Sequence, residues 1–219
     1  MKIQWLGHSA FLITTRNGAR VLMDPYESGA YGGGIGYGPI QVEADLVTIS
    51  HDQHEDHNCL KTVGGNPSVI KGKEGGIVRG IVVRRVQTYH DNSGGRERGE
   101  NQVTCLEADG MSVCHLGDLG HLLTPEQVAG IGSPDVLLVP VGGIFTVDPR
   151  EATQVVAQLQ PRLVIPMHYK TSKCGFPIAA VDEFLEGKPA VEKTGTSTLE
   201  VQAGSLGEGT RIVVLEHAL

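Results

Sequence analysis

Long apolar runs are absent from the 219-residue sequence, and so is the basic start followed by an apolar segment that marks a secretory signal. A membrane-spanning helix needs about 20 consecutive, mostly apolar residues. The first residues, Met1 to Leu6, have the composition of a strand and not that of a signal peptide. We therefore expect a protein with no membrane span and a cytoplasmic location.

Cysteine and basic residues are also scarce. The four cysteines are scattered and none shows Cys-x-x-Cys spacing, which predicts reduced thiols and no disulfide framework. The net charge is −7. Binding to nucleic acid without sequence preference needs a clustered basic surface, so this charge argues against it. We expect a small-molecule substrate and no nucleic-acid partner. An anionic substrate is compatible with this charge, because bound metal ions can reverse the local field.

The apolar content is sufficient for a packed core. Hydrophobic residues make up 40% of the chain and charged residues only 20%, which argues against disorder. Domains reach roughly 200–250 residues before they split, so the sequence predicts a single domain over residues 1–219. No motif specifies the oligomeric state, and a homo-oligomer is compatible with the sequence.

Strand signals dominate the first half of the chain, and helix signals come later. Asn17-Gly18 and Asp109-Gly110 each lie between paired apolar runs, which predicts two hairpins. Thr124 and Asp148 each begin a segment with an N-cap residue, a following proline, and Gln or Glu three residues on. The pattern indicates an α/β fold. The expected strands are Lys2–Leu6, Ala10–Thr14, Arg20–Met23, Leu46–Ser50, Gly80–Tyr89, Gln102–Ala108, Ser112–His115, Val136–Val141, Leu163–Pro166, Ser197–Gln202 and Arg211–Leu215, with a third, shorter helix at Val181–Leu185.

Two polar loops are expected to shape a pocket. The segment Glu27–Pro39 contains six glycines and few apolar side chains, and long loops in compact domains are usually functional or mobile. The second loop follows His90 and carries Arg96, Arg98 and Asn101. A solvated loop is the leading interpretation for each of these three, and contact with an anionic group is the alternative.

The densest chemical signal lies in residues 51–57. Nine histidines in 219 residues predict about 0.3 in a seven-residue window, yet this one holds His51, His54 and His57 together with two aspartates and a glutamate. Imidazole and carboxylate are ligands that divalent cations prefer. A solvated polar turn is the weaker alternative. The segment follows an apolar strand, so the pattern predicts a metal site at a strand end.

Three more candidate ligands follow other strands. His90, Asp118 and His168 each come at or just after the end of an expected strand. Each alone would more often be an ordinary surface or core residue. Side chains carried on strand ends converge at one edge of a sheet, so we expect these residues to meet residues 51–57.

Taken together, these motifs resemble the metallo-β-lactamase superfamily, whose pattern is His-x-His-x-Asp-His, then a distant His, a Gly-Asp and a last His. Four motifs resemble the compact branch that includes ascorbate-6-phosphate lactonase and the N-acyl-phosphatidylethanolamine phospholipase D enzymes. They are Gly7-His8-Ser9, Met23-Asp24-Pro25, Gly117-Asp118 and Pro166-Met167-His168-Tyr169. The resemblance covers essentially the whole chain. It implies a four-layer αβ/βα sandwich with a binuclear metal site, typically zinc, with manganese or iron in some relatives.

The resemblance also assigns ligands position by position. It implies His51, His54 and His90 for the first metal, and Asp56, His57 and His168 for the second. Asp118 would bridge the two ions. Asp24 is expected to order the loops around the site and not to bind metal itself.

One spacing departs from the family pattern, because two residues separate His51 from His54 where the family has one. Residues two apart share a face of an extended chain, whereas residues three apart need a bulge or a bend. His51 can keep the first-ligand position if the extra residue is looped out. Alternatively, Asp52 takes that position, which would favour manganese or iron over zinc. The strand ending at Ser50 favours His51.

The implied chemistry is hydrolysis. Two divalent ions about 3.5–4 Å apart share a hydroxide, because metal binding lowers the pKa of water from 15.7 to about 7. Asp118 would bridge the metals and Asp56 would orient this nucleophile from the second site, and no Gly-x-Ser-x-Gly nucleophile motif is present. His121 or His8 would protonate the leaving group or orient a ligand, and a structural hydrogen bond between loops is the alternative for both. Tyr169 and Lys170 follow His168 and are further candidates for substrate contact.

We therefore expect a metal-dependent hydrolase of a small ester, lactone or phosphodiester. A nuclease of the same superfamily is disfavoured by the chain length and the acidic charge. A di-iron redox protein of the same fold usually has glutamate where this chain has His54, and adds a flavin domain. A non-hydrolytic metal-binding protein is the remaining alternative.

Overall fold

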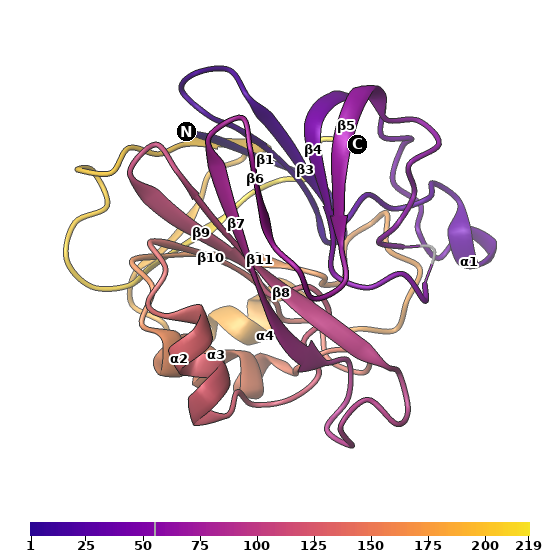
Figure 1. Cartoon of the computed structure of the whole chain (residues 1–219). Coiled ribbons are helices and arrows are strands. Elements are labelled where there is room, and N and C mark those ends of the chain that lie inside the picture. Colours follow the sequence, from indigo (N-terminus) through magenta and orange to yellow (C-terminus); the bar gives the residue numbers. More distant parts are fainter. Residues whose placement is uncertain (55) are drawn as a thin grey trace.

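The computed structural model describes residues 1–54 and 56–219, and two β-sheets packed face to face make up most of it (Figure 1). The six-stranded sheet has the order β13 (Thr198–Glu200), β1 (Lys2–Gly7), β2 (Ala10–Thr14), β3 (Arg20–Met23), β4 (Glu43–Ile49), β5 (Gly64–Lys71). The eight-stranded sheet has the order β12 (Val191–Lys193), β14 (Arg211–Val214), β11 (Leu163–Met167), β10 (Val136–Pro140), β9 (Met111–His115), β8 (Glu100–Ala108), β7 (Ile81–Tyr89), β6 (Gly76–Val78). Both sheets are mixed, and the expected α/β sandwich is confirmed.

Strand direction decides which loops can meet. In the first sheet β1, β3 and β4 run the same way, because β2 is antiparallel to both β1 and β3 while β3 and β4 are parallel. In the second sheet β7, β9, β10 and β11 run the same way for the same reason. The carboxyl ends of these strands therefore lie along one edge of each sheet.

The core follows the two-residue period of the strands. Phe11 and Ile13 of β2 face the main core, which joins the two sheets, whereas Leu12 faces a second apolar cluster on the outer side of the first sheet. Tyr26, Ile35 and other residues of the 24–42 loop supply that second cluster. A packed loop thus covers this outer face, where the expected layer was helical.

Three helices lie together on one side of the eight-stranded sheet (Figure 1). They are α2 (Pro125–Ile131), α3 (Pro149–Leu159) and α4 (Val181–Leu185). The predicted capping boxes are confirmed: the Thr124 hydroxyl accepts from the backbone of Gln127, and the Asp148 carboxylate accepts from the backbone of Glu151. A fourth, four-residue segment, α1 (Ala30–Gly33), contains two left-handed residues and belongs to the glycine-rich loop. None of the helices in the described part of the chain is both long and apolar enough to cross a membrane.

Both predicted hairpins are confirmed as the β2–β3 and β8–β9 turns. Three strands were not predicted, namely β5, β6 and β12. β5 lies at a sheet edge, is largely exposed and contains Pro67, so it lacks the apolar alternation that marks a strand. β6 and β12 are only three residues long, which is too short for a periodic signal.

Candidate metal centre

Five strand ends deliver the polar residues of the site. His8 follows β1, Asp118 follows β9 and His168 follows β11, while His51 and His90 follow β4 and β7. All five are buried. The predicted convergence at the carboxyl edge of the strands is therefore what the structure shows.

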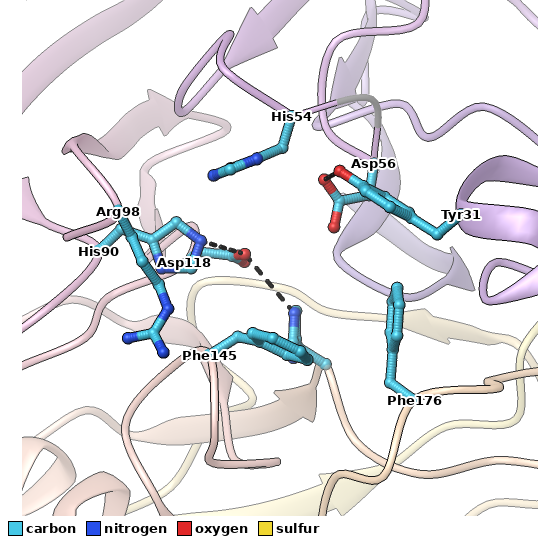
Figure 2. A pocket seen from close by; sticks show the side chains of 9 residues that line it. Tyr31, His54, Asp56, His90, Arg98, Asp118, Phe145 and Phe176 are labelled. Carbon is cyan, nitrogen blue, oxygen red and sulfur yellow. Dashed lines mark hydrogen bonds and ion pairs between the residues drawn. The ribbon is translucent and has the colours of Figure 1, made fainter.

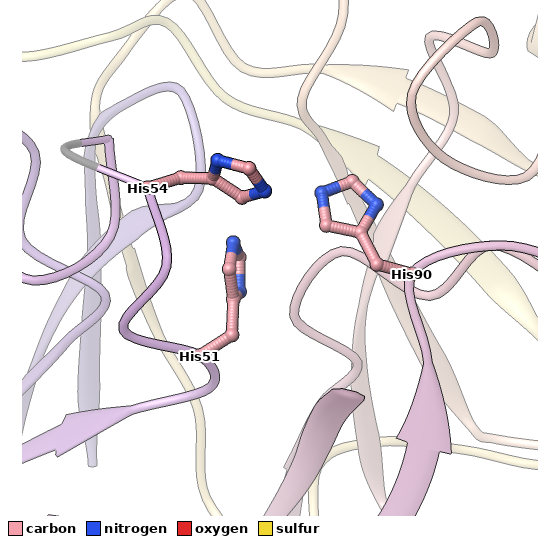
Figure 3. A group of neighbouring side chains, drawn as sticks. All are labelled: His51, His54 and His90. Carbon is pink, nitrogen blue, oxygen red and sulfur yellow. The ribbon is translucent and has the colours of Figure 1, made fainter. Parts of the chain in front are cut away.

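His51, His54 and His90 form one compact group (Figure 3). One ring nitrogen from each lies within 4.8 Å of the other two. The ring centroids of His51 and His90 are 5.1 Å apart, and those of His54 and His90 are 5.4 Å apart. Figure 3 shows the three rings turned toward a common point, as ligands of one cation would be.

The extra residue between His51 and His54 is taken up by a bend. Residues 52–54 form no strand or helix, and the Asp52 carboxylate lies 3.5 Å from the exposed Lys71 ammonium. The Asp52 side chain is 58% exposed, whereas His51 is buried. Of the two alternatives for the first ligand, the structure brings His51 to the cluster and leaves Asp52 at the surface.

Asp118 lies at the centre of the remaining ligands. Its Oδ1 is 2.9 Å from Nε2 of His57, and its Oδ2 is 3.2 Å from Nε2 of His90 and 3.5 Å from Nε2 of His168. His51, His57 and Asp118 also form a group with donor atoms within 4.8 Å of one another. One carboxylate thus reaches histidines of both predicted metal positions.

Asp56 connects the second position to the first strand. Its Oδ1 is 3.1 Å from Nδ1 of His57 and accepts a hydrogen bond from the hydroxyl of Tyr31 at 3.2 Å. Its Oδ2 is 3.3 Å from Nε2 of His8. A ring nitrogen of His8 also lies within 4.8 Å of donor atoms of Asp56 and His57, and its ring centroid is 4.2 Å from that of His168, so His8 lies beside the second predicted metal position.

Burial and mutual charge set the protonation of the cluster. Burial raises the pKa of the Asp118 carboxyl, but the combined effect of His57 and His168 is larger and opposite. The pKa of Asp118 therefore lies well below its usual range. Burial lowers the pKa of His51 well below its usual range, with His57 adding to the effect. His57 goes the other way, because Asp118 and Asp56 outweigh its burial and raise its pKa. The ionised Asp118 carboxylate and the neutral His51 imidazole are forms that bind divalent cations, whereas His57 would release its proton when a cation binds it.

Several buried donor atoms have no hydrogen-bond partner among the described residues. They include Nε2 of His51, both ring nitrogens of His57, Nδ1 of His90, Nδ1 of His168 and Oδ1 of Asp118. The short contacts to Asp118 bring opposite charges together, but they do not give His57 a hydrogen bond of good geometry. Leaving so many buried polar atoms unpaired is costly unless a cation binds them. The donor set and its orphaned atoms therefore fit divalent metal ions.

A buried hydrogen-bond network through Asn101 fixes the backbone of Asp118. The backbone N–H of Asp118 donates to Oδ1 of Asn101, and the Asn101 amide donates to the Thr88 hydroxyl and the Leu116 carbonyl. Gly117 has a φ of +57°, and a Cβ there would lie 2.3 Å from Oδ1 of Asn101. Only glycine fits this position, because both the left-handed backbone and the close side chain exclude larger residues.

Asp24 and His115 form a second supporting network. Oδ1 of Asp24 accepts a 2.7 Å hydrogen bond from the backbone of Ser50, which precedes the histidine segment. His115 accepts from the backbone N–H of Gly117 and donates Nε2–H to the carbonyl of Ser9. As expected, Asp24 orders the loops without joining the ligand cluster. His115 was not predicted, because a histidine that ends a strand carries no sign of a supporting role.

Three predicted candidates lie away from the cluster. His121 accepts from the backbone of Tyr89 and donates to the carbonyl of Leu122, so both ring nitrogens are engaged by backbone. These contacts agree with the alternative that His121 makes structural hydrogen bonds between loops, and they leave neither ring nitrogen free to protonate a leaving group. Tyr169 is buried with its ring against Trp5, and Lys170 donates to the carbonyl of Phe176. Neither lines the pocket beside the cluster, so their expected contact with substrate is not supported.

A cavity of about 250 Å³ opens onto the cluster (Figure 2). Its polar side is formed by His54, Asp56, His90, Asp118 and His168, and its other side by Tyr31, Arg98, Phe145 and Phe176. Tyr31 comes from the glycine-rich loop and Arg98 from the loop after His90, so both loops shape the pocket as predicted. The two phenylalanines were missed, because neither belongs to a periodic pattern or to a motif.

The comparisons with known proteins agree with this geometry. Residues 2–168 match the family model described as the beta-lactamase superfamily domain. The crystal structure of a candidate Zn-dependent hydrolase of the metallo-β-lactamase superfamily, from Thermotoga maritima, superimposes with a TM-score of 0.82. It is 38% identical in sequence, and the match covers 99% of this chain and 98% of that one.

Two further proteins extend the likeness. A UPF0173 metal-dependent hydrolase from Thermococcus onnurineus is 33% identical over 208 residues, covering 84% of this chain and 89% of its own. A metallo hydrolase from Ignicoccus hospitalis shares the fold, with a TM-score of 0.58 at 22% identity over 84% of this chain and 88% of that one. The fold expected from the motif resemblance is thus confirmed.

Proposed function

This chain belongs to the β-lactamase superfamily and is a metal-dependent hydrolase, and we propose that it uses two divalent metal ions to cleave a small ester, lactone or phosphodiester. The observation that carries the proposal is the pair of donor groups joined by Asp118 beside a cavity of about 250 Å³. A cavity of this size suits a small molecule.

The ligands divide into two sets. His51, His54 and His90 would hold the first ion. Asp56, His57 and His168 would hold the second, and Asp118 would contact both. When bound, such ions lower the pKa of water toward 7 and polarise the carbonyl or phosphoryl oxygen under attack. Zinc is the proposed metal, because a site rich in imidazole suits it, and manganese or iron is the alternative.

The residues around Asp56 set both its ionisation and its position. Asp56 stays ionised although it is buried, because His57 and His8 together lower the pKa of its carboxyl. Its position is set from two sides by Tyr31 and His8, so it can accept a hydrogen bond from a water molecule in the pocket. His8 itself is neutral at pH 7, because burial and His168 lower its pKa to about 4.

The proposal is tested by a turnover screen of the metal-loaded protein against bis(4-nitrophenyl) phosphate, a set of γ- and δ-lactones, and 4-nitrophenyl and thiol esters, with metal content measured in parallel. The His54→Ala variant should lose metal and lower turnover at least about 100-fold, because it removes a ligand. The Asp52→Asn variant is the matched control in the same segment, and it should keep both metal and turnover. Loss of metal in Asp52→Asn but not in His51→Ala would instead make Asp52 the first ligand. A folded protein that takes up no metal would contradict the proposed function.

A further inference from the structure

Arg98 is a half-buried cation on the wall of the pocket. It lines the cavity beside His90 and Asp118, and its guanidinium carbon lies 6.0 Å from the centre of the Phe145 ring (Figure 2). Within residues 1–54 and 56–219, no carboxylate lies within 4 Å of its guanidinium nitrogens. A guanidinium that is partly withdrawn from water and has no counter-ion is available to a ligand.

The loop that carries Arg98 is rigidly held. Asp91 is buried and accepts four backbone hydrogen bonds of 2.8–3.0 Å, from Ser93, Gly95, Glu97 and Arg98 itself. The neighbouring Arg96 is exposed and donates to the carbonyl of Ser93, so it does not reach the pocket. Arg98 is therefore the basic side chain of this loop that lines the cavity, and the backbone that carries it is held in place by Asp91.

Aromatic rings line the wall next to Arg98. The ring of Phe176 lies 5.5 Å from that of Phe145 and 5.6 Å from that of Tyr31, both in edge-to-face arrangements. Phe145 is held by a tight turn in which its backbone N–H donates to the carbonyl of Gly143, with Ile144 between them at a φ of +63°. A non-glycine residue in this conformation is strained, and such strain is kept mainly at functional positions. The wall offers a ligand apolar contact opposite the donor cluster.

We propose that the substrate carries an anionic group, carboxylate or phosphate, that is separate from the bond cleaved and is bound by Arg98. The part between this anion and the scissile bond is apolar or aromatic and lies against Phe145 and Phe176. This inference rests on the proposed function, because it assumes that the scissile bond lies at the metal ligands. The planar fork of an arginine matches two oxygens of either anion, which distinguishes such a substrate from a neutral ester of the same shape.

The test is equilibrium binding by calorimetry to the metal-loaded protein, with 3-phenylpropionate, 2-phenylethyl phosphate and the neutral 3-phenylpropan-1-ol as probes. Arg98→Gln should weaken the binding of at least one anion about 10- to 100-fold and leave the alcohol unaffected. Arg98→Lys, which keeps the charge without the fork, should weaken it less. Arg96→Gln on the same loop is the control and should bind all three probes as the parent does. The anion that loses more affinity identifies which group the site recognises.

Two results would overturn the inference. If Arg98→Gln binds both anions as tightly as Arg96→Gln does, the anions sit on the metal ions and not on Arg98. If neither anion binds the parent protein at millimolar concentration, the pocket has no such subsite. Thermal unfolding of each variant shows whether it is folded. Arg98-dependent binding without any turnover in the ester, lactone and phosphodiester screen would contradict the proposed function and leave the anion site standing.

Discussion

Three residues of the site lie in the left-handed region of the backbone although none is glycine. His8, Asp24 and His168 have φ values of +50°, +45° and +50°. Each follows directly on a strand and points a side chain into the cluster or its support. Conformations of this kind cost on the order of 1–3 kcal/mol each and persist where the surroundings enforce them. The packed strands thus hold these three side chains in positions that an isolated loop would not adopt.

Gly117 offers a test of how closely the chain approaches itself at the site. A Cβ there would lie 2.3 Å from Oδ1 of Asn101 and 2.6 Å from the Cβ of Ser50. Gly117→Ala should therefore lower the free energy of unfolding by about 1–3 kcal/mol beyond the cost of the left-handed backbone. It should also displace Asp118 and weaken metal binding.

Gly110→Ala is the matched control for this prediction. Gly110 has a φ of +76°, and no atom lies within 4 Å of where a Cβ would be. An alanine there is destabilised by the left-handed backbone alone, with no steric clash. Urea unfolding of the two variants measures the difference. Equal destabilisation would show that the close approach of Asn101 and Ser50 does not constrain the site.

At the scale of elements, the loops after the strands matter more than the helices. α2, α3 and α4 carry none of the proposed ligands, whereas loops after β1, β4, β7, β9 and β11 carry all the residues of the cluster. The helices support the eight-stranded sheet through apolar residues such as Val155 and Leu159 of α3. Their start signals are local and were readable in the sequence, but they say little about the chemistry.

The loop between β7 and β8 should respond to acid through Asp91. Burial raises the pKa of its carboxyl, but the four backbone N–H donors lower it more, to about 2 from an ordinary value of 3.8. Because the folded pKa is depressed, this carboxylate stabilises the protein above about pH 4, and the contribution is lost as the pH falls toward 2. Asp91→Asn should lower the free energy of unfolding by about 1–3 kcal/mol at neutral pH.

The measurement is the urea midpoint of the parent and Asp91→Asn from pH 7 down into the acid range. The difference between them should be constant above pH 4 and shrink below it. Asp182→Asn is the control, since that side chain is 72% exposed and pairs only with Lys193 among the described residues. A difference that stays constant through the acid range would rule out the ionised Asp91 as the organiser of the loop.

At the scale of the whole molecule, the site joins the two sheets. His8 and His51 come from the first sheet, whereas His90, Asp118 and His168 come from the second. Any cation bound by these residues therefore links the two halves of the fold, and its binding energy adds to the stability of the folded state.

Removal of metal should lower the thermal stability of the parent protein. An ion present at 100 times its dissociation constant stabilises the fold by about 2.7 kcal/mol, so chelation should lower the Tm by about 5–10 °C. Scanning calorimetry before chelation, after it, and after return of zinc or manganese measures the effect. Asp118→Asn is the control, because it should bind little metal and show little response to the chelator. An unchanged Tm in a parent protein that had contained metal would contradict the link between the sheets.

The sequence by itself determined the residue types of the site and their convergence. Ligand-type residues follow apolar runs at residues 51–57, His90, Asp118 and His168, and parallel strands bring their carboxyl ends to one edge. Strand and helix positions were readable wherever local periodicity or caps mark them, and the exposed edge strand β5 was not. These are short-range properties, so one stretch of chain is enough to reveal them.

Only the tertiary structure decided which neighbours act together. It places His51 in the cluster and leaves Asp52 at the surface. It engages the His121 ring in hydrogen bonds to the backbone. Of the two arginines in the loop after His90, it places Arg98 in the pocket wall and Arg96 outside the pocket. It also assembled an aromatic wall from Tyr31, Phe145 and Phe176, which are far apart in sequence. Such contacts depend on how loops from different strands pack against each other, and no period or spacing within one loop carries that information.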